Sequence, residues 1–407
     1  VEAMKVSPGV VSTDRMLAVT TLSFDISLLE LTVPLSVGAQ IVIATQDEAL
    51  DGYDLCDLIT DNEVTIMQAT PATWRLMLDC EWEGTRGLKA LCGGEPLPPA
   101  LAEKLLPYTS ELWNMYGPTE TTVWSTCVKV STQEDITVGT PIDNTVVYVL
   151  DDHQRPVPRG VPGELWIGGA GVALGYIGKP DLTGDRFRPD PFAAHEGARM
   201  YRTGDRAILR PDGSIEMRGR RDNQVKVRGH RIELGEVEDV LARHEALDAV
   251  AVAVRQDHHG EPMLAAFIVL AAGKHVTHSD LRQWLRHSVP DYMVPQVFVE
   301  MDQLPLTGNN KLDRNALPEA VSLRLVETDR VPPRTDRERE IAALWQEMLE
   351  ITDISVTDNF FELGGQSLQV AKMSALLRKM HGYRISPRAV IFETLEQLAA
   401  SVEREAS

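Results

Sequence analysis

Cysteine is scarce in this chain, and the few cysteines that occur are widely separated. Cys56, Cys80, Cys92 and Cys127 form no C-x-x-C pair in a chain of 407 residues. A zinc knuckle or a disulfide framework needs cysteines at short repeated spacings, so the sequence argues against both. We interpret the four cysteines as reduced, buried thiols of a cytoplasmic protein.

The chain also has fewer basic than acidic residues, and it has no long apolar run. Lys and Arg number 40 against 60 Asp and Glu, which gives a net charge of -20. This balance opposes the counterion release that holds proteins on nucleic acid or anionic lipid, so we expect neither nucleic acid nor membrane as a partner. No apolar run approaches the roughly 20 residues that cross a bilayer, and the N-terminus has no signal-peptide layout. Because the chain opens on Val1 in mid-pattern, we expect further sequence upstream.

Apolar residues are abundant enough for more than one domain. With 43% hydrophobic residues, a chain of 407 residues can bury two or three cores. Apolar runs at 38–44, 64–69 and 146–150 alternate with helical patterns, which predicts a large α/β unit. Residues 207–219 contain two short strand patterns around Pro-Asp-Gly, and Gly213 would supply the positive φ of a tight hairpin turn.

A smaller α+β unit is predicted to follow, so that the large unit covers residues 1–221 and the small one residues 222–320. The expected elements of the small unit are a helix near 236–245, strands at 249–254 and 264–270, and a second helix that starts near Ser279 or Asp280. Adjacent prolines among charged residues, without apolar periodicity, favour a semi-rigid linker at 321–335.

A small helical bundle is predicted at residues 336–407. Thr335 and Glu338 form a capping-box pair ahead of the first amphipathic pattern. A second helix should cover about residues 367–380, and a third should begin at Thr394, with Gln397 as its capping-box partner. Three amphipathic helices in so short a segment are typical of a bundle.

Three polar turns could carry chemistry, although each is unspecific alone. YGPTE at 116–120 combines an aromatic ring, a hydroxyl and a carboxylate, which could stack on a base, contact a phosphate and hold Mg²⁺. YRTGD at 201–205 places Asp205 behind a glycine, where it could bind ribose hydroxyls or only begin the hairpin. Lys311 lies on a turn, where a solvated charge is the default interpretation.

The order of the motifs is much more specific than any one of them. The successive motifs are FDIS at 24–27, YGPTE, GELWIGG at 163–169, YRTGD, GRRDNQVKVRGHRIELGEVE at 219–238, VPDYMVP at 289–295 and the Lys311 turn. Together they resemble the later core motifs of nonribosomal peptide synthetase adenylation domains. DNFFELGGQSL at 358–368 resembles the carrier-domain motif that follows in such synthetases. The resemblance covers nearly the whole chain.

This resemblance implies a two-step reaction. ATP and an amino acid give an aminoacyl adenylate and pyrophosphate, and a carrier thiol then takes the acyl group. The implied ATP and AMP contacts are Gly93, Gly94, Asn114, Tyr116, Gly117, Thr119, Asp205 and Arg220. Lys311, Glu120, Asp205 and Arg220 are the implied catalytic residues, with Glu120 as the Mg²⁺ ligand. A cation such as Lys311, aimed at charge that develops on phosphorus, stabilises the transition state more than the ground state.

The resemblance also implies a mobile small domain and a modified carrier. The hinge falls on Asp222, and its movement would bring Lys311 into the site and then withdraw it; a plain turn residue is the alternative. Ser367 would receive 4′-phosphopantetheine from a phosphopantetheinyl transferase, and a helix start favours a nearby phosphate. An N-cap serine is the other interpretation of Ser367. Neighbouring condensation or other synthetase domains are the remaining expected partners.

The amino-acid pocket of the family can also be placed on this sequence. Its implied lining is Asp25, Ile26, Leu29, Ala69, Leu91, Gly93, Met115, Val123, Trp124 and Lys311. Asp25 would pair with the α-ammonium group of the substrate. The bulky apolar remainder resembles the lining of glycine-activating domains, so we expect glycine, followed by alanine. Simple core packing is the alternative for Leu91 and Ala69.

The sequence departs from the family pattern in one major respect. The Gly/Ser/Thr-rich loop with a Lys, which holds the ATP β- and γ-phosphates in the family, is not found here, and we expect it upstream. A non-catalytic carrier or docking module that is loaded by a separate partner is the alternative function. A free-standing acyl-CoA ligase would lack both the role of Asp25 and the fused carrier. Smaller departures are Leu174, Asn310 and Gln366, where the family commonly has Arg, Gly, and His or Asp.

Overall fold

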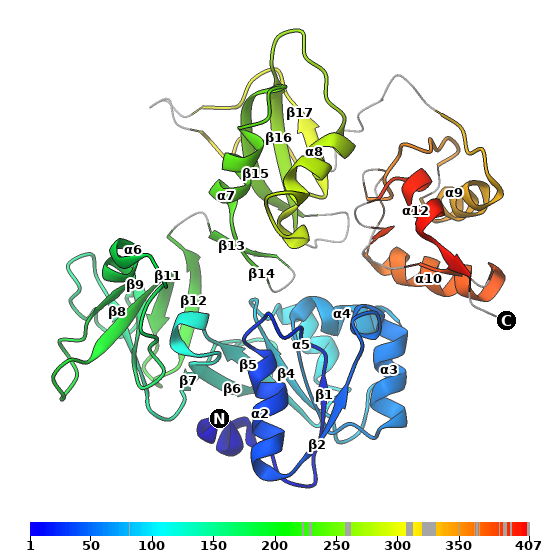
Figure 1. The fold of residues 1–407 in the computed structure, drawn as a ribbon. Coiled ribbons are helices and arrows are strands. Elements are labelled where there is room, and N and C mark those ends of the chain that lie inside the picture. The colour runs from blue at the N-terminus through cyan, green and yellow to red at the C-terminus, as the bar shows by residue number, and fades with distance from the viewer. Residues whose placement is uncertain are drawn as a thin grey trace. The chain divides into compact units, whose positions relative to one another are not determined.

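The computed structural model shown in Figure 1 divides into two compact units, Val1–Asp222 and Asn223–Ser407. It describes residues 1–80, 82–221, 224–227, 230–256, 262–306, 312–319, 331–349, 351–361, 363, 365, 367–381, 383–385, 389–390 and 393–404. In these ranges, no helix combines the length and apolar character that crossing a membrane requires.

A seven-stranded sheet forms the base of the first unit, with the order β2-β1-β3-β4-β5-β6-β7. The first five strands of this order are parallel and the last two are antiparallel. The strands are β1 (Arg15–Ala18), β2 (Gln40–Ile43), β3 (Ile66–Ala69), β4 (Lys89–Gly93), β5 (Glu111–Tyr116), β6 (Thr126–Val130) and β7 (Thr140–Pro141). The strands predicted at 38–44 and 64–69 are therefore confirmed as β2 and β3.

Two hydrophobic cores lie on the opposite faces of this sheet, because successive residues of a strand point to opposite sides. Met67 of β3 packs in one core with side chains from α3 (Gly52–Asp61), α4 (Pro71–Asp79) and α5 (Pro99–Leu105). Ile66 packs in the other core with side chains from α2 (Ser27–Val37). The shorter helical segments of this part are α1 (Glu2–Met4), η1 (Lys5–Gly9), η2 (Glu48–Leu50) and η3 (Thr119–Thr121).

Local sequence explains the ends of several of these helices. Asp51 accepts hydrogen bonds from two backbone N–H groups at the start of α3. Thr70 caps α4 through its side chain, and Pro71 follows at the first helical position, where its missing N–H costs nothing. The α2 helix ends at Gly38, whose φ of 77° is readily accessible to glycine.

A second sheet completes the first unit. It is antiparallel, with the order β10-β11-β9-β8, and β12 pairs with β11. Its strands are β8 (Thr145–Leu150), β9 (Pro162–Gly169), β10 (Phe187–Pro189), β11 (Arg199–Leu209) and β12 (Ile215–Arg220), and α6 (Pro180–Arg186) precedes β10. The predicted strand at 146–150 and the hairpin at 207–219 are confirmed, and Gly213 has a φ of 90°.

The part of the second unit that follows residue 223 has the predicted α+β composition. Its sheet has the order β15-β16-β17, and β13 pairs separately with β14. The elements are β13 (Gln224–Val227), β14 (His230–Glu233), α7 (Leu234–Leu241), β15 (Leu247–Gln256), β16 (Pro262–Leu270), α8 (His278–Arg286), η4 (Asp291–Met293) and β17 (Val297–Glu300). Both predicted helices and both predicted strands are present, although α7 begins and ends a few residues earlier than expected.

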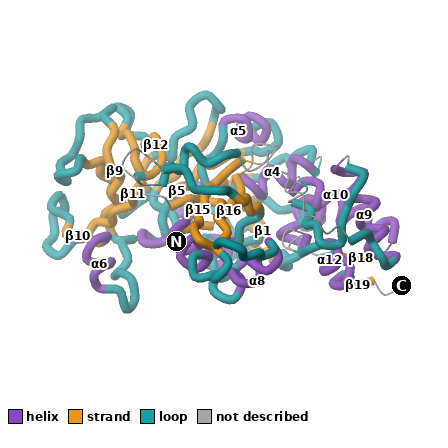
Figure 2. The backbone as a smooth tube through the Cα atoms, turned by 90° about the horizontal axis from the view of Figure 1, so that it is seen from above, coloured by secondary structure: helices purple, strands orange, loops and turns teal. Residues whose placement is uncertain are grey.

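The C-terminal part contains α9 (Asp336–Leu349), α10 (Ser367–His381) and α12 (Leu395–Ser401), drawn in purple in Figure 2. Both capping boxes of this part are formed: Thr335 with Glu338, and Thr394 with Gln397. The three helices enclose one core around Trp345. The prediction of three amphipathic helices is confirmed, whereas the short pair of β18 (Tyr383–Arg384) and β19 (Glu403–Arg404) was not predicted.

Candidate active site

Several residues predicted to contact ligands follow the carboxyl ends of neighbouring parallel strands. Asp25 lies in the segment after β1, Gly93 ends β4 and Tyr116 ends β5. The β3 strand lies between β1 and β4 in the sheet. In open α/β sheets, ligands bind in the crevice outside the carboxyl ends of the strands. The topology therefore brings motifs far apart in the sequence to one edge of the sheet.

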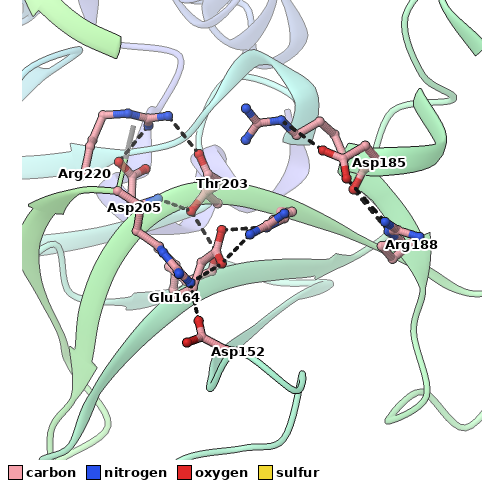
Figure 3. Close-up of polar contacts among 11 residues, drawn as sticks. Asp152, Glu164, Asp185, Arg188, Thr203, Asp205 and Arg220 are labelled. Atoms are coloured by element: carbon pink, nitrogen blue, oxygen red, sulfur yellow. Dashed lines mark hydrogen bonds and ion pairs between the residues drawn. The ribbon is translucent and has the colours of Figure 1, made fainter. Parts of the chain in front are cut away.

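Each oxygen of the Asp205 carboxylate accepts a hydrogen bond. Arg220 Nη1 donates to Asp205 Oδ1 at 2.8 Å, as Figure 3 shows, and Tyr116 OH donates to Oδ2 at 2.5 Å. Pairing of β11 with β12 places Asp205 opposite Arg220. Each carboxylate oxygen has a second lone pair, so Asp205 can still accept two further hydroxyl donors. A ribose diol has that arrangement.

The surroundings of Asp205 keep its partner Tyr116 protonated and fix the backbone of Asp205 itself. Burial, followed by the negative charge of Asp205 and the hydrogen bond to it, holds the pKa of Tyr116 well above its usual value. Tyr116 therefore remains a neutral donor at physiological pH. Thr203 Oγ1 accepts the Asp205 N–H at 3.0 Å and donates to Leu165 O at 2.7 Å, which fixes the backbone of the carboxylate.

The turn after β5 is closely packed against the following residues. A Cβ on Gly117 would lie 2.3 Å from Val123 O and 2.6 Å from Trp124 Cα, so only glycine fits there. Asn114 is buried, and its amide donates to Thr137 O at 2.7 Å. Gly94 has a φ of 84°, in the region that glycine adopts most easily.

Glu120 offers a buried carboxylate beside the exposed Thr119 in η3. Tyr176 OH donates to Glu120 Oε1 at 2.7 Å. Burial and hydrogen bonds with Tyr201 and Glu120 raise the pKa of Tyr176, which remains a donor. Among the residues whose positions are described, no group of three or more His, Cys, Asp or Glu side chains could hold a metal ion. One carboxylate fits an ion such as Mg²⁺ that takes further ligands from water and substrate phosphates.

Asp25 carries an oxygen whose hydrogen-bonding capacity is unused. Asp25 Oδ2 is buried and has no hydrogen-bond partner among the described residues. Leaving a buried carboxylate oxygen unpaired is unfavourable, because it has lost its contacts with water. A ligand with an ammonium group would supply the missing donor.

Trp124 forms a wall against Gly93. A Cβ on Gly93 would lie 2.3 Å from Trp124 Cη2, so the indole fills the space that a side chain would need. Trp124 is buried, as are Ile26, Leu29, Leu91 and Met115, which pack in the same core on one face of the sheet. These residues therefore form a packed core on this face of the sheet, and their role as pocket lining stays a prediction.

Gln68 is the polar residue that sequence reasoning missed. Trp124 Nε1 donates to Gln68 Oε1 at 2.9 Å, and Gln68 Nε2 donates to Ile26 O at 3.0 Å and to Glu30 Oε1 at 2.9 Å. The neighbouring residue Ala69 packs in the core on the other face of the sheet. Gln68 is thus the residue of β3 whose side chain is hydrogen-bonded to Trp124. The signal in the sequence that could have identified Gln68 is a polar amide residue in an otherwise apolar strand.

Backbone strain accompanies the same wall. Thr122 and Val123 have φ values of 66° and 71°, a region that a β-branched residue rarely adopts. Trp124 N donates to Thr122 O at 3.0 Å across this tight turn. Strain of this kind persists only where the surroundings fix it, and it clusters at functional sites.

Three family models match this chain in succession. Residues 1–177 match "AMP-binding enzyme", residues 236–311 match "AMP-binding enzyme C-terminal domain", and residues 339–402 match "Phosphopantetheine attachment site". The chain is 46% identical over 395 residues to a dimodular nonribosomal peptide synthase of Bacillus subtilis (strain 168), covering 96% of this chain and 16% of that protein. The chain belongs to the nonribosomal peptide synthetase family and combines an adenylation domain with a fused carrier domain.

Solved structures of this family agree in fold. The chain is 29% identical to an adenylation and carrier-domain synthetase bound to a vinylsulfonamide inhibitor, with a TM-score of 0.73 and coverage of 96% of this chain and 65% of that one. It is 42% identical to a four-domain synthetase bound to AMP and glycine, with a TM-score of 0.54 and coverage of 98% and 30%. The chain thus spans a small part of the larger synthetases that it matches.

Three predicted functional positions of this adenylation and carrier chain are described incompletely or not at all. Lys311 and the hinge residue Asp222 lie outside the described residues. Ser367 begins α10, at the start of a helix as the carrier motif predicted, while its side chain lies outside the description. The assigned roles of these residues stay predictions.

Proposed function

We propose that this chain activates an amino acid and transfers it to its own carrier domain. In the first step, a substrate carboxylate oxygen attacks the α-phosphorus of ATP, and the bond to the leaving pyrophosphate breaks. In the second step, the thiolate of phosphopantetheine on Ser367 attacks the acyl carbon, and AMP leaves. The three matching family models, in this order along one chain, support the combination of the two steps.

The observation that carries the first step is the Asp205 carboxylate, held between Tyr116 and Arg220. Both partners are donors, so each carboxylate oxygen acts as an acceptor and the group is oriented before nucleotide binds. Bound hydroxyls of ribose would take the remaining lone pairs. Such preorganisation places the α-phosphate at a defined distance from the sheet edge and lowers the entropic part of the barrier.

Further residues would bind the metal ion and stabilise the negative charge of the phosphates. Glu120 would hold Mg²⁺, which neutralises phosphate charge when it is bound. Lys311 would contact the substrate carboxylate and the α-phosphate during adenylation and leave with the small domain afterwards. Asp222 would be the hinge of that movement.

We further propose glycine as the preferred substrate, with alanine second. Asp25 would bind the α-ammonium with its unpaired Oδ2, while the Trp124 indole over Gly93 leaves little space for a side chain. The similar four-domain synthetase that was solved with AMP and glycine supports the same choice. A single methylene is worth only about 1–3 kcal/mol in discrimination, so some alanine activation should remain.

An amino-acid-dependent ATP–pyrophosphate exchange assay tests the proposal. Exchange should be strongest with glycine, weaker with alanine, and reduced at least about tenfold by Asp205→Asn through loss of charge-assisted hydrogen bonds. The assay should use this chain and a longer synthetase polypeptide that contains it. If neither supports exchange with any amino acid, while a phosphopantetheinyl transferase still modifies Ser367, the chain is a carrier module that a partner loads.

A further inference from the structure

We propose that Gln68 and Glu30 are positioning residues that determine amino-acid specificity by fixing the Trp124 indole. This inference rests on the amino-acid pocket proposed above, and it names two residues that set how large a substrate side chain the pocket admits. Glu30 is a fully buried carboxylate that none of the proposed reaction steps uses. It lies on α2, beside β1 in Figure 1, and Gln68 lies on β3, the strand that pairs with β1.

The Glu30 carboxylate is surrounded by hydrogen-bond donors. Its Oε2 atom accepts the backbone N–H groups of Val19 and Thr20 at 3.0 and 2.9 Å. Its Oε1 atom accepts the Thr20 hydroxyl at 2.5 Å and the Gln68 amide at 2.9 Å. Burial raises the pKa of Glu30, and these hydrogen bonds oppose that rise. A buried carboxylate held by neutral donors is costly, which favours a role in orienting its neighbours over simple packing.

The chemistry of its partners fixes which way the Gln68 amide points. Ile26 O and the Glu30 carboxylate are acceptors, so both face the amide NH₂ group, at 3.0 and 2.9 Å. An indole N–H can only donate, so Trp124 faces the amide oxygen, at 2.9 Å. A reversed amide would set NH₂ against N–H at Trp124. The orientation that Glu30 imposes on the amide is thereby transmitted to the indole.

The same two side chains hold the segment that carries Asp25. Glu30 binds the first two backbone N–H groups of residues 19–26, and Gln68 binds the last carbonyl of that segment. Disturbing the Asp25 segment would weaken all α-amino acids alike, because each carries the same ammonium group. Movement of the Trp124 indole would instead change the preference between small and larger side chains. The two effects can therefore be separated by comparing substrates.

The test compares Gln68→Met and Glu30→Gln with Gln40→Met, which changes an exposed glutamine at the start of β2. Glu30→Gln replaces one accepting oxygen by an NH₂ donor, which favours the reversed Gln68 amide. Both site variants should lower the ratio of kcat/KM for glycine over alanine in ATP–pyrophosphate exchange at least about fivefold. Gln40→Met should keep the ratio of the parent protein. Because both rates come from one preparation, an unfolded fraction cancels in the ratio.

Trp124→Phe separates the indole N–H from general packing. Without an N–H to orient, the addition of Gln68→Met should change the ratio by less than about twofold. A full fivefold effect in that background would overturn the proposal, since Gln68 would then act through another group. Equal losses for glycine and alanine in Gln68→Met and Glu30→Gln would also overturn it, because they indicate a general structural defect.

NMR of protein with isotope-labelled tryptophan separates this inference from the proposed function, because it needs no activity. The Trp124 indole N–H resonance is identified by its loss in Trp124→Phe, and it should shift in Gln68→Met and in Glu30→Gln. The Trp284 resonance, whose N–H donates to Val240 O at 3.0 Å, should not shift. An unmoved Trp124 resonance would overturn the positioning role, whatever the activity of the protein. Absence of exchange with any amino acid in the parent protein would contradict the proposed function alone.

Discussion

Replacing Gly93 with alanine tests whether the Trp124 indole is a rigid wall of the amino-acid pocket. The new Cβ would lie 2.3 Å from Trp124 Cη2, 2.8 Å from Cζ3 and 2.9 Å from Met115 O. Met115 belongs to the neighbouring strand β5, whose pairing with β4 prevents the backbone from shifting to relieve the contact. The indole would have to move by about 1 Å to reach ordinary contact. Its hydrogen bond to Gln68, at 2.9 Å, opposes that movement.

The expected cost combines overpacking with a damaged hydrogen bond. Overpacking of a dense core costs about 1–3 kcal/mol, and weakening the hydrogen bond to the buried Gln68 oxygen costs about 1 kcal/mol. We expect Gly93→Ala to lower the free energy of unfolding by about 2–4 kcal/mol. Trp124→Phe removes both atoms that the new Cβ would strike. In the double variant, the added methyl should therefore cost about 2 kcal/mol less than it does beside Trp124.

Calorimetric unfolding of the parent, both single variants and the double variant measures this coupling. For a unit of this size, Gly93→Ala should lower Tm by about 5–15 °C. Gly184→Ala is the matched control, because a Cβ there would meet no described atom within 4 Å apart from its chain neighbours and the backbone of its own helix, and its φ is ordinary. Glycine-dependent pyrophosphate exchange should fall in parallel in Gly93→Ala. Strictly additive effects, or a Gly93→Ala protein as stable as the parent, would refute the rigid wall.

Three further predictions follow from the same site and carrier. Asp25→Asn should raise the KM for glycine about 10- to 100-fold through the loss of a charged hydrogen bond, without lowering Tm; an unchanged KM contradicts the ammonium role. Ser367→Ala should abolish the mass increase after phosphopantetheinyl transferase treatment, and a modified variant would contradict the attachment site. Burial raises the pKa of Cys56 and of Cys80 to about 12, so about 0.01% of each is thiolate at pH 8. Iodoacetamide should label only the pantetheine thiol, and labelling of the apo protein detected by mass spectrometry would disprove this.

Short-range signals in the sequence predicted much of the fold. The turn at Gly213 and the capping boxes at Thr335 and Thr394 depend on residues within a few positions, and all three are formed. Apolar runs identified β2, β3 and β8 because buried strands need continuous or alternating apolar residues. The sheet order could not be obtained in this way, since it depends on pairing between segments far apart.

The contacts that define the site were much less accessible from sequence. Gln68 and Ala69 are adjacent, and a shift of one residue moves a side chain to the other face of the sheet. The sequence indicated Ala69 for the pocket lining, with core packing as the alternative; in the structure Ala69 packs in a core, and Gln68 is the residue hydrogen-bonded to Trp124. The Glu30–Gln68 contact joins residues 38 positions apart, so neither residue signals its partner locally. The role of Tyr176 as the donor to Glu120, 56 residues away, was equally hidden.

The contacts of Arg220 and Arg221, the last described residues of the first unit, bear on the hinge proposed at residue 222. Arg220 is bound to Asp205, while Arg221 Nη1 donates to Glu164 Oε2 at 3.1 Å and to Asp152 at 2.7 Å. Figure 3 shows that Glu164, Asp152 and Asp205 belong to one polar cluster of the antiparallel sheet. Glu164 is buried and also accepts hydrogen bonds from Arg202 at 2.8 Å and 3.2 Å, so Arg221 is attached to a carboxylate that is itself fixed in the sheet. In the movement proposed for residue 222, rotation would begin after Arg221, because Arg220 is held by Asp205 of the proposed nucleotide site and Arg221 is held by Glu164 and Asp152.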